Sequence, residues 1–163
     1  KKRVFLMNWE SAGKLPWGVL LLFGGGLSLA GVIRSSGLAE WIAQSLGALG
    51  ALPVIAIIGV VVLVIIFLTE ITSNTATAAA FLPLLGALAV AQGMPAELLA
   101  IPAAIAASCA FMMPVATPPN AIVFGTGHMK IQSMIKAGFV LNLFGVLLVS
   151  LLCYGLVGWI WAS

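Results

Sequence analysis

The polar segment Thr69-Glu70-Ile71-Thr72-Ser73-Asn74-Thr75 interrupts an otherwise apolar part of the chain. The run before it, Pro53 to Leu68, would span only about 24 Å as a helix. The run after it, Ala76 to Val90, is also shorter than the roughly 20 residues that a full crossing needs. Two short helices around a polar tip predict a re-entrant hairpin over residues 53–91. Because non-helical backbone at membrane depth must be covered by protein or line a water-filled cavity, we expect the tip to line a site.

A second interruption follows the apolar run from Leu98 to Met113. It reads Pro114-Val115-Ala116-Thr117-Pro118-Pro119-Asn120, with three prolines in six residues. Proline removes a backbone donor and clashes with the preceding turn, so we expect the helix to stop here and to resume over 121–127. The run is also compatible with a surface turn. Its place inside about 30 mostly apolar residues favours a broken membrane helix over residues 98–128.

The composition indicates a membrane protein. Hydrophobic residues make up 63% of the chain, charged residues 7%, and the mean hydropathy is +1.23. With about 20 residues per crossing, the length allows roughly four or five hydrophobic passes of an all-α, polytopic protein in the lipid bilayer. The chain has no Asp and one His, so hydrolase triads and metal clusters lack their residues, and we expect no enzyme activity.

The remaining segments complete a predicted three-part organisation. Residues 1–50 are expected to hold a cytoplasmic connector, a first transmembrane helix and an interfacial helix that carries Glu40, Trp41 and Gln44. Residues 51–133 are expected to hold the transport-domain elements, and residues 134–163 the final transmembrane helix, with Trp159 and Trp161 as candidate interfacial anchors.

The net charge of +3 is best interpreted as membrane topology, because no basic patch of the kind that binds nucleic acid is present. Three crossings place six of the seven basic residues on the cytoplasmic side of an inner (plasma) membrane and Arg34 opposite. Two full spans in place of the hairpin would give the same distribution.

Both interruptions carry chemistry suited to ions. Carbonyl oxygens at the end of a half-helix attract cations, and free amides at its start attract anions. Thr69, Thr72 and Asn74 can offer oxygens to a hard cation, while Asn74 and Thr75 can hold a carboxylate. The Ala116 carbonyl and Thr117 can act likewise from the second interruption. The alternative for residues 73–75 is ordinary capping of the next helix.

Glu70 and His128 each leave two roles open. Glu70 is the one carboxylate inside a hydrophobic stretch, which makes it a candidate ionisable gate, as proton relay, cation ligand or partner of a distant Arg. The alternative is a structural acceptor for backbone amides. His128 precedes Lys130 at a helix end, where a solvated role is favoured over metal ligation.

The two interruptions resemble the C-terminal motifs of the divalent-anion/sodium symporter family. Residues 69–75 followed by alanines look like its Ser-Asn-Thr signature, and residues 114–121 resemble its other motif. The resemblance covers essentially the whole chain, as the C-terminal half of an inverted-repeat carrier. It implies symport of Na⁺ with a C4-dicarboxylate such as succinate, malate or fumarate, with no cofactor besides the coupling ion. It further implies a homodimer and an elevator-like movement.

Carried over by position, the family's site gives each motif residue a role. Sodium would be bound by Thr69, Thr72, Asn74 and Ala116. The substrate would contact Ser73, Asn74 and Thr75, with Thr117 and Pro118 at its edge. The family has a second Ser-Asn-Thr hairpin in its N-terminal half and this chain has one triplet, so we expect a missing N-terminal half. Alternatives are a carrier of another anion (sulfate, citrate or arsenite) or a noncatalytic membrane subunit.

Overall fold

The computed structural model describes residues 8–15, 17, 21, 24, 25, 28, 31, 32, 35–38, 41 and 52–161. These residues form helices and connections, with no strand among them, which confirms the all-α prediction. The helices are α1 (Trp9–Gly13), α4 (Val54–Thr69), α5 (Asn74–Ala91), α6 (Glu97–Ala106), α7 (Pro118–Gly125) and α8 (Ile131–Trp161). The predicted connector at residues 1–7, most of the predicted first span, Arg34, Glu40 and Gln44 lie outside the described residues.

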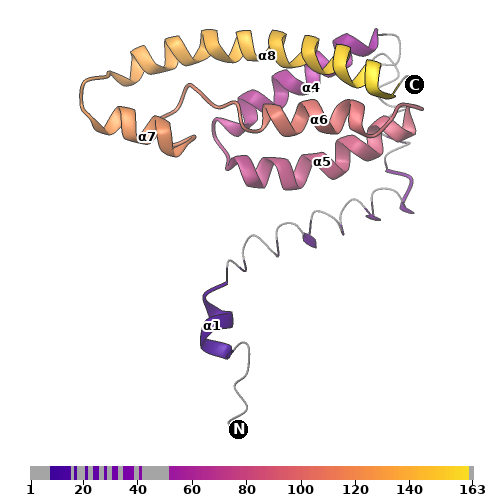
Figure 1. Cartoon of the computed structure of the whole chain (residues 1–163), viewed down its shortest axis with the longest axis horizontal. Helices are drawn as coiled ribbons and strands as arrows, with labels where there is room; N and C mark the ends of the chain where they lie inside the picture. Colours follow the sequence, from indigo (N-terminus) through magenta and orange to yellow (C-terminus); the bar gives the residue numbers. More distant parts are fainter. Residues whose placement is uncertain are drawn as a thin grey trace.

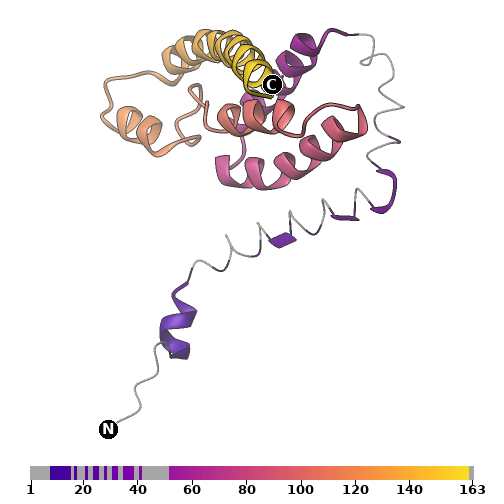
Figure 2. The same ribbon diagram turned by 45° about the vertical axis from the view of Figure 1, so that its right-hand side comes forward.

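Four helices pack side by side in alternating directions. Helix α6 lies between α5 and α8, and α4 packs against both α6 and α8 (Figures 1 and 2). Branched side chains of α4, among them Ile58 and Ile66, fill the core between these helices. Small residues of α6, such as Ala103 and Ala106, let the helices approach closely, as is common when helices pack in lipid.

The predicted hairpin is present as two helices joined by a short turn. Helix α4 ends at Thr69, the turn covers residues 70–73, and α5 begins at Asn74. Helix α5 is three residues longer than the apolar run at 76–90, and its length and composition suffice for a membrane span. Helix α4, at 16 residues, is shorter. The two helices therefore differ in length, although both were expected to be too short to cross the membrane.

The second interruption begins earlier than the sequence predicts. We expected helix up to Met113, but α6 ends at Ala106, and residues 107–117 are not helical. The backbone amides of residues 111–113 bond to the Glu70 side chain instead of to carbonyls of a preceding turn. The helix therefore ends well before Pro114, and contacts distant in sequence replace helical bonds at residues 111–113.

The second half-helix also begins earlier than predicted. Helix α7 starts at Pro118, whereas the sequence predicts a start at residue 121. Pro118 and Pro119 occupy its first turn, where a helix needs no N–H donor and the fixed φ of proline is favourable. The prediction that these two prolines stay outside a helix was therefore wrong.

Helix α8 is the longest element. Its apolar part, Ile131–Val157, is 27 residues long, which is sufficient to cross a bilayer. Trp159 follows near its end with 79% of its surface exposed, as an interfacial anchor requires.

Candidate functional site

The hairpin tip and the second interruption face each other across a polar cavity of about 620 Å³. The cavity contains most of the predicted site residues. It is lined by Glu70, Ile71, Thr72, Ser73, Asn74 and Thr75 from the tip, and by Val115, Ala116 and Pro118 from the interruption. Thr69 and Thr117, which were also predicted to belong to the site, do not line it.

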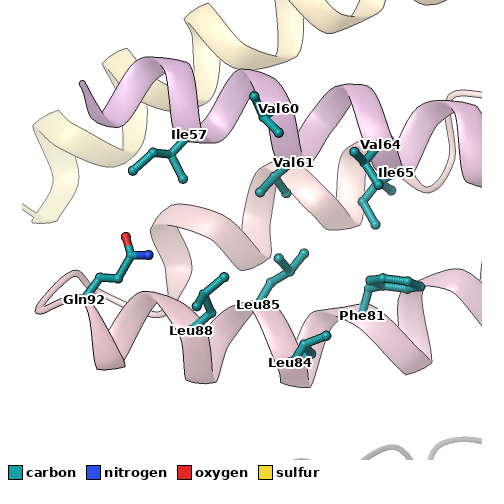
Figure 3. A pocket seen from close by; sticks show the side chains of 10 residues that line it. All are labelled: Ile57, Val60, Val61, Val64, Ile65, Phe81, Leu84, Leu85, Leu88 and Gln92. Carbon is teal, nitrogen blue, oxygen red and sulfur yellow. The ribbon is translucent and has the colours of Figure 1, made fainter. Parts of the chain in front are cut away.

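A second cavity, of about 260 Å³, differs in chemistry. It lies between α4 and α5, where apolar side chains of the two helices face each other and Gln92 is the only polar lining residue (Figure 3). Because an ion in such surroundings would lose its hydration without gaining partners, this cavity does not suit a charged ligand. The polar cavity at the hairpin tip is therefore the candidate site.

Thr69 is fully buried and directly precedes Glu70, which lines the polar cavity. Its hydroxyl oxygen is 2.7 Å from Asn74 Oδ1 and 2.9 Å from the carbonyl oxygen of Ala107. One hydroxyl proton can serve only one of these two acceptors at a time, so lone pairs remain for a cation. The structure thus brings together Thr69 and Asn74, as predicted, and adds the Ala107 carbonyl. Sequence reasoning missed this carbonyl because no Gly or Pro marks the end of α6 at that position.

The Thr72 hydroxyl makes hydrogen bonds within the hairpin. Its hydroxyl donates to the Leu68 carbonyl at 2.8 Å, and the Thr77 hydroxyl lies 2.6 Å away. Since the single Thr72 proton goes to Leu68, Thr77 is the donor to Thr72. The hydroxyl of Thr72 therefore belongs to a separate cluster from Thr69 and Asn74, although Thr72 lines the cavity. The buried Thr77 was not singled out from the sequence.

The start of α5 offers free donors to the cavity. The backbone amides of Asn74 and Thr75 have no hydrogen-bond partner among the described residues. Free amides at the positive end of a helix form a favourable site for an anion. The capping contact at this end is long, because Ala76 N lies 3.5 Å from Ser73 Oγ. Capping of α5 is therefore a poor explanation for the polar side chains at residues 73–75.

The start of α7 is chemically different from that of α5. Pro118 and Pro119 have no N–H, and the first available amide, of Asn120, donates to Thr117 Oγ1 at 3.3 Å. The next amide, of Ala121, bonds to the Thr117 carbonyl. Helix α7 therefore presents no free amide to an anion, and Thr117 acts as a cap. Ala116 lines the cavity, and its carbonyl accepts no hydrogen bond from the described residues.

Glu70 is held by donors from two directions. Its Oε1 accepts from Phe111 N at 2.7 Å, from Met112 N at 2.9 Å and from Asn142 Nδ2 at 2.8 Å, and its Oε2 accepts from Met113 N at 3.0 Å. Only 4% of its surface is exposed. These contacts are those of a structural acceptor for backbone amides, the alternative to an ionisable gate.

Known proteins resemble this chain along its whole length. Residues 3–162 match the family described as sodium:sulfate symporter transmembrane region. The chain is 50% identical over 157 residues to the sodium-dependent dicarboxylate transporter SdcS of Staphylococcus saprophyticus, covering 96% of this chain and 30% of that protein. It is also 50% identical over 149 residues to SdcS of Staphylococcus aureus strain USA300, covering 91% and 29%. The chain thus spans about 30% of the length of these curated relatives.

Proposed function

The chain belongs to the sodium:sulfate symporter family, and from this premise we propose that it is the C-terminal part of a plasma-membrane carrier that couples Na⁺ entry to uptake of a C4-dicarboxylate. The observation that carries the proposal is the polar cavity, which is lined by Asn74 and Thr75, with free backbone amides, and by Ala116. Such a pairing of anion and cation sites at helix breaks is typical of secondary transporters. The relatives with 50% identity are sodium-dependent dicarboxylate transporters, which supports the substrate class.

One substrate carboxylate is proposed to bind at the start of α5. The amides of Asn74 and Thr75 and the exposed Thr75 hydroxyl are the donors there, with Ser73 beside them. An ionised carboxylate accepts such bonds more strongly than a neutral oxygen does. Because α7 begins with two prolines, the second carboxylate must find its donors elsewhere, with Pro118 contributing only contact at the edge. Those donors are proposed to come from an N-terminal half with its own hairpin.

Sodium is proposed to bind to neutral oxygens beneath the anion. The oxygens of Thr69 and Asn74 and the carbonyl of Ala116 belong to the predicted set, and the carbonyl of Ala107 extends it. Coupling follows from this arrangement, because a bound cation beside the start of α5 attracts the anion and completes its site.

The proposal is tested by uptake of radiolabelled succinate into proteoliposomes that contain the complete carrier. We expect uptake to require an inward sodium gradient. The Asn74→Ala variant should insert normally into the membrane but lose this uptake. Uptake that proceeds equally well without sodium would refute the coupling. Unlabelled malate, fumarate, sulfate and citrate are added as competitors, because amides and hydroxyls hold any divalent oxyanion. Stronger competition by sulfate than by malate or fumarate would replace the dicarboxylate with sulfate as substrate.

A homodimeric carrier that moves its binding site by an elevator-like motion is part of the same proposal. It rests on the family resemblance. Cross-linking of the purified carrier in detergent and in lipid would test the dimer, and a monomer in both media would contradict it.

A further inference from the structure

We propose that Glu70 is a positioning residue, whose carboxylate group holds the backbone of residues 107–117 in the shape that the binding cavity needs. In this role it binds neither the sodium ion nor the transported anion. The inference rests on the proposed function for what the cavity holds, but the contacts that carry it are independent of any ligand.

The backbone after α6 lacks helical hydrogen bonds. The amides of Phe111, Met112 and Met113 have no helical carbonyl to bond, and buried amides without partners are costly. All three donate to the Glu70 carboxylate, at 2.7, 2.9 and 3.0 Å. One side chain of the hairpin tip therefore satisfies three consecutive amides of the opposite wall.

The carbonyl side of the same loop is held by another side chain. Asn120 Nδ2 donates to the carbonyls of Ala110 and Met113, each at 3.0 Å. The loop is thus fixed by Glu70 through its amides and by Asn120 through its carbonyls. Both ligand carbonyls proposed above flank the held part of the loop: Ala107 precedes Ala110 and Ala116 follows Met113.

Helix α8 contacts both Glu70 and the loop after α6. Asn142, fully buried, donates its Nδ2 to Glu70 Oε1 at 2.8 Å. One turn earlier, Gly138 lies directly against the backbone of Phe111 and Met112. The loop is therefore held between Glu70 and α8, and its position depends on both.

The partners of Glu70 favour a fixed carboxylate over a gate. All four are N–H donors, and both carboxylate oxygens of Glu70 are used as acceptors. A gate needs a second arrangement of partners, and three of the four here belong to the main chain. Since Oε1 alone accepts three bonds, little capacity remains there for a cation.

The test is Glu70→Gln in the complete carrier, with Glu97→Gln as the matched control. Gln keeps the size of Glu but turns an amide nitrogen toward one of the backbone donors. We expect the half-saturating sodium concentration and the KM for succinate to rise about tenfold, as the loss of one buried bond implies, with a smaller change in kcat. Glu97→Gln, at the start of α6 and outside the cavity, should leave both unchanged.

Two results of this experiment would overturn the inference. Unchanged sodium and succinate dependence in Glu70→Gln, with only less folded protein, would mean a purely structural residue. Loss of sodium dependence with an unchanged KM for succinate would mean a direct sodium ligand, because a positioning residue affects both sites.

Hydrogen–deuterium exchange provides a readout that does not depend on transport. Glu70→Gln should speed exchange in the peptide that covers residues 107–117 and leave the peptide of α5 unchanged. Asn142→Leu, which removes one donor and keeps the carboxylate, should have the same effect to a smaller degree. Unchanged exchange in both variants would overturn the inference, whereas a wild-type carrier without sodium-dependent uptake would refute only the proposed function.

Discussion

Gly138 of α8 lies so close to Phe111 that a Cβ atom on the glycine would be 2.3 Å from the Phe111 carbonyl oxygen. The same Cβ would be 2.5 Å from Cα of Met112. Both contacts are with backbone, which cannot move aside as the end of a side chain can. Helix α8 therefore reaches the loop after α6 only because residue 138 has no side chain. Asn142 lies one turn further along and meets Glu70 from the same face.

Gly138→Ala is expected to destabilise the carrier. The added methyl must displace the backbone that donates to Glu70, so the free energy of unfolding should fall by about 1–3 kcal/mol or more. Thermal unfolding of the purified carrier in detergent measures the effect. Gly155→Ala is the matched control, because it lies on α8 with nothing within 4 Å of its Cβ position, and it should not be destabilised. Equal transition temperatures for the two variants would contradict the close approach.

The hairpin and its polar tip could be predicted because their cause is local. A polar segment between two short apolar runs is incompatible with one continuous span, and the same segment contains the residues that line the cavity. Likewise, the prolines at residues 114, 118 and 119 indicated a break in the second helix. The sequence alone therefore located both walls of the candidate site.

The end of α6 and the role of Glu70 could not be predicted because their cause is distant in sequence. Thr69 bonds to Ala107 across 38 residues, and Glu70 reaches Phe111 across 41. Asn142 lies 72 residues from Glu70 inside an apolar helix, and its polar side chain was a signal that sequence reasoning did not use. The prolines at 118 and 119 were misassigned because proline is unfavourable inside a helix but favourable in its first turn.

Asn142→Asp is expected to be more damaging than Asn142→Leu. Leu removes one donor from Glu70, which should lower the free energy of unfolding by about 1–3 kcal/mol. Asp places a second carboxylate beside the first, where both are buried, and the repulsion should exceed that loss. Thermal unfolding of both variants at pH 7 ranks them. If Asp were tolerated as well as Leu, the direct contact between residue 142 and the Glu70 carboxylate would be contradicted.

Thr69→Val should weaken sodium binding with little effect on the size of the buried side chain. The substitution removes the hydroxyl that joins Asn74 to the Ala107 carbonyl, and it leaves both acceptors without their donor. We expect the half-saturating sodium concentration to rise about tenfold or more. Sodium-dependent succinate uptake measures it. Thr126→Val, which loses only local bonds to the Val123 carbonyl and from His128 N outside the cavity, is the control and should match the wild type.

Thr75→Val should weaken binding of the anion more than binding of sodium. The Thr75 side chain is exposed, lines the cavity and makes no hydrogen bond among the described residues, so the fold does not depend on its hydroxyl. Loss of one hydroxyl donor to a charged ligand corresponds to about 1.5–3 kcal/mol, which is roughly a 10- to 150-fold rise in the KM for succinate. The half-saturating sodium concentration, measured at saturating succinate, should change much less, because the sodium oxygens are proposed to be those of Thr69 and Asn74. A variant whose sodium dependence shifts while its KM for succinate is unchanged would place the anion away from the start of α5.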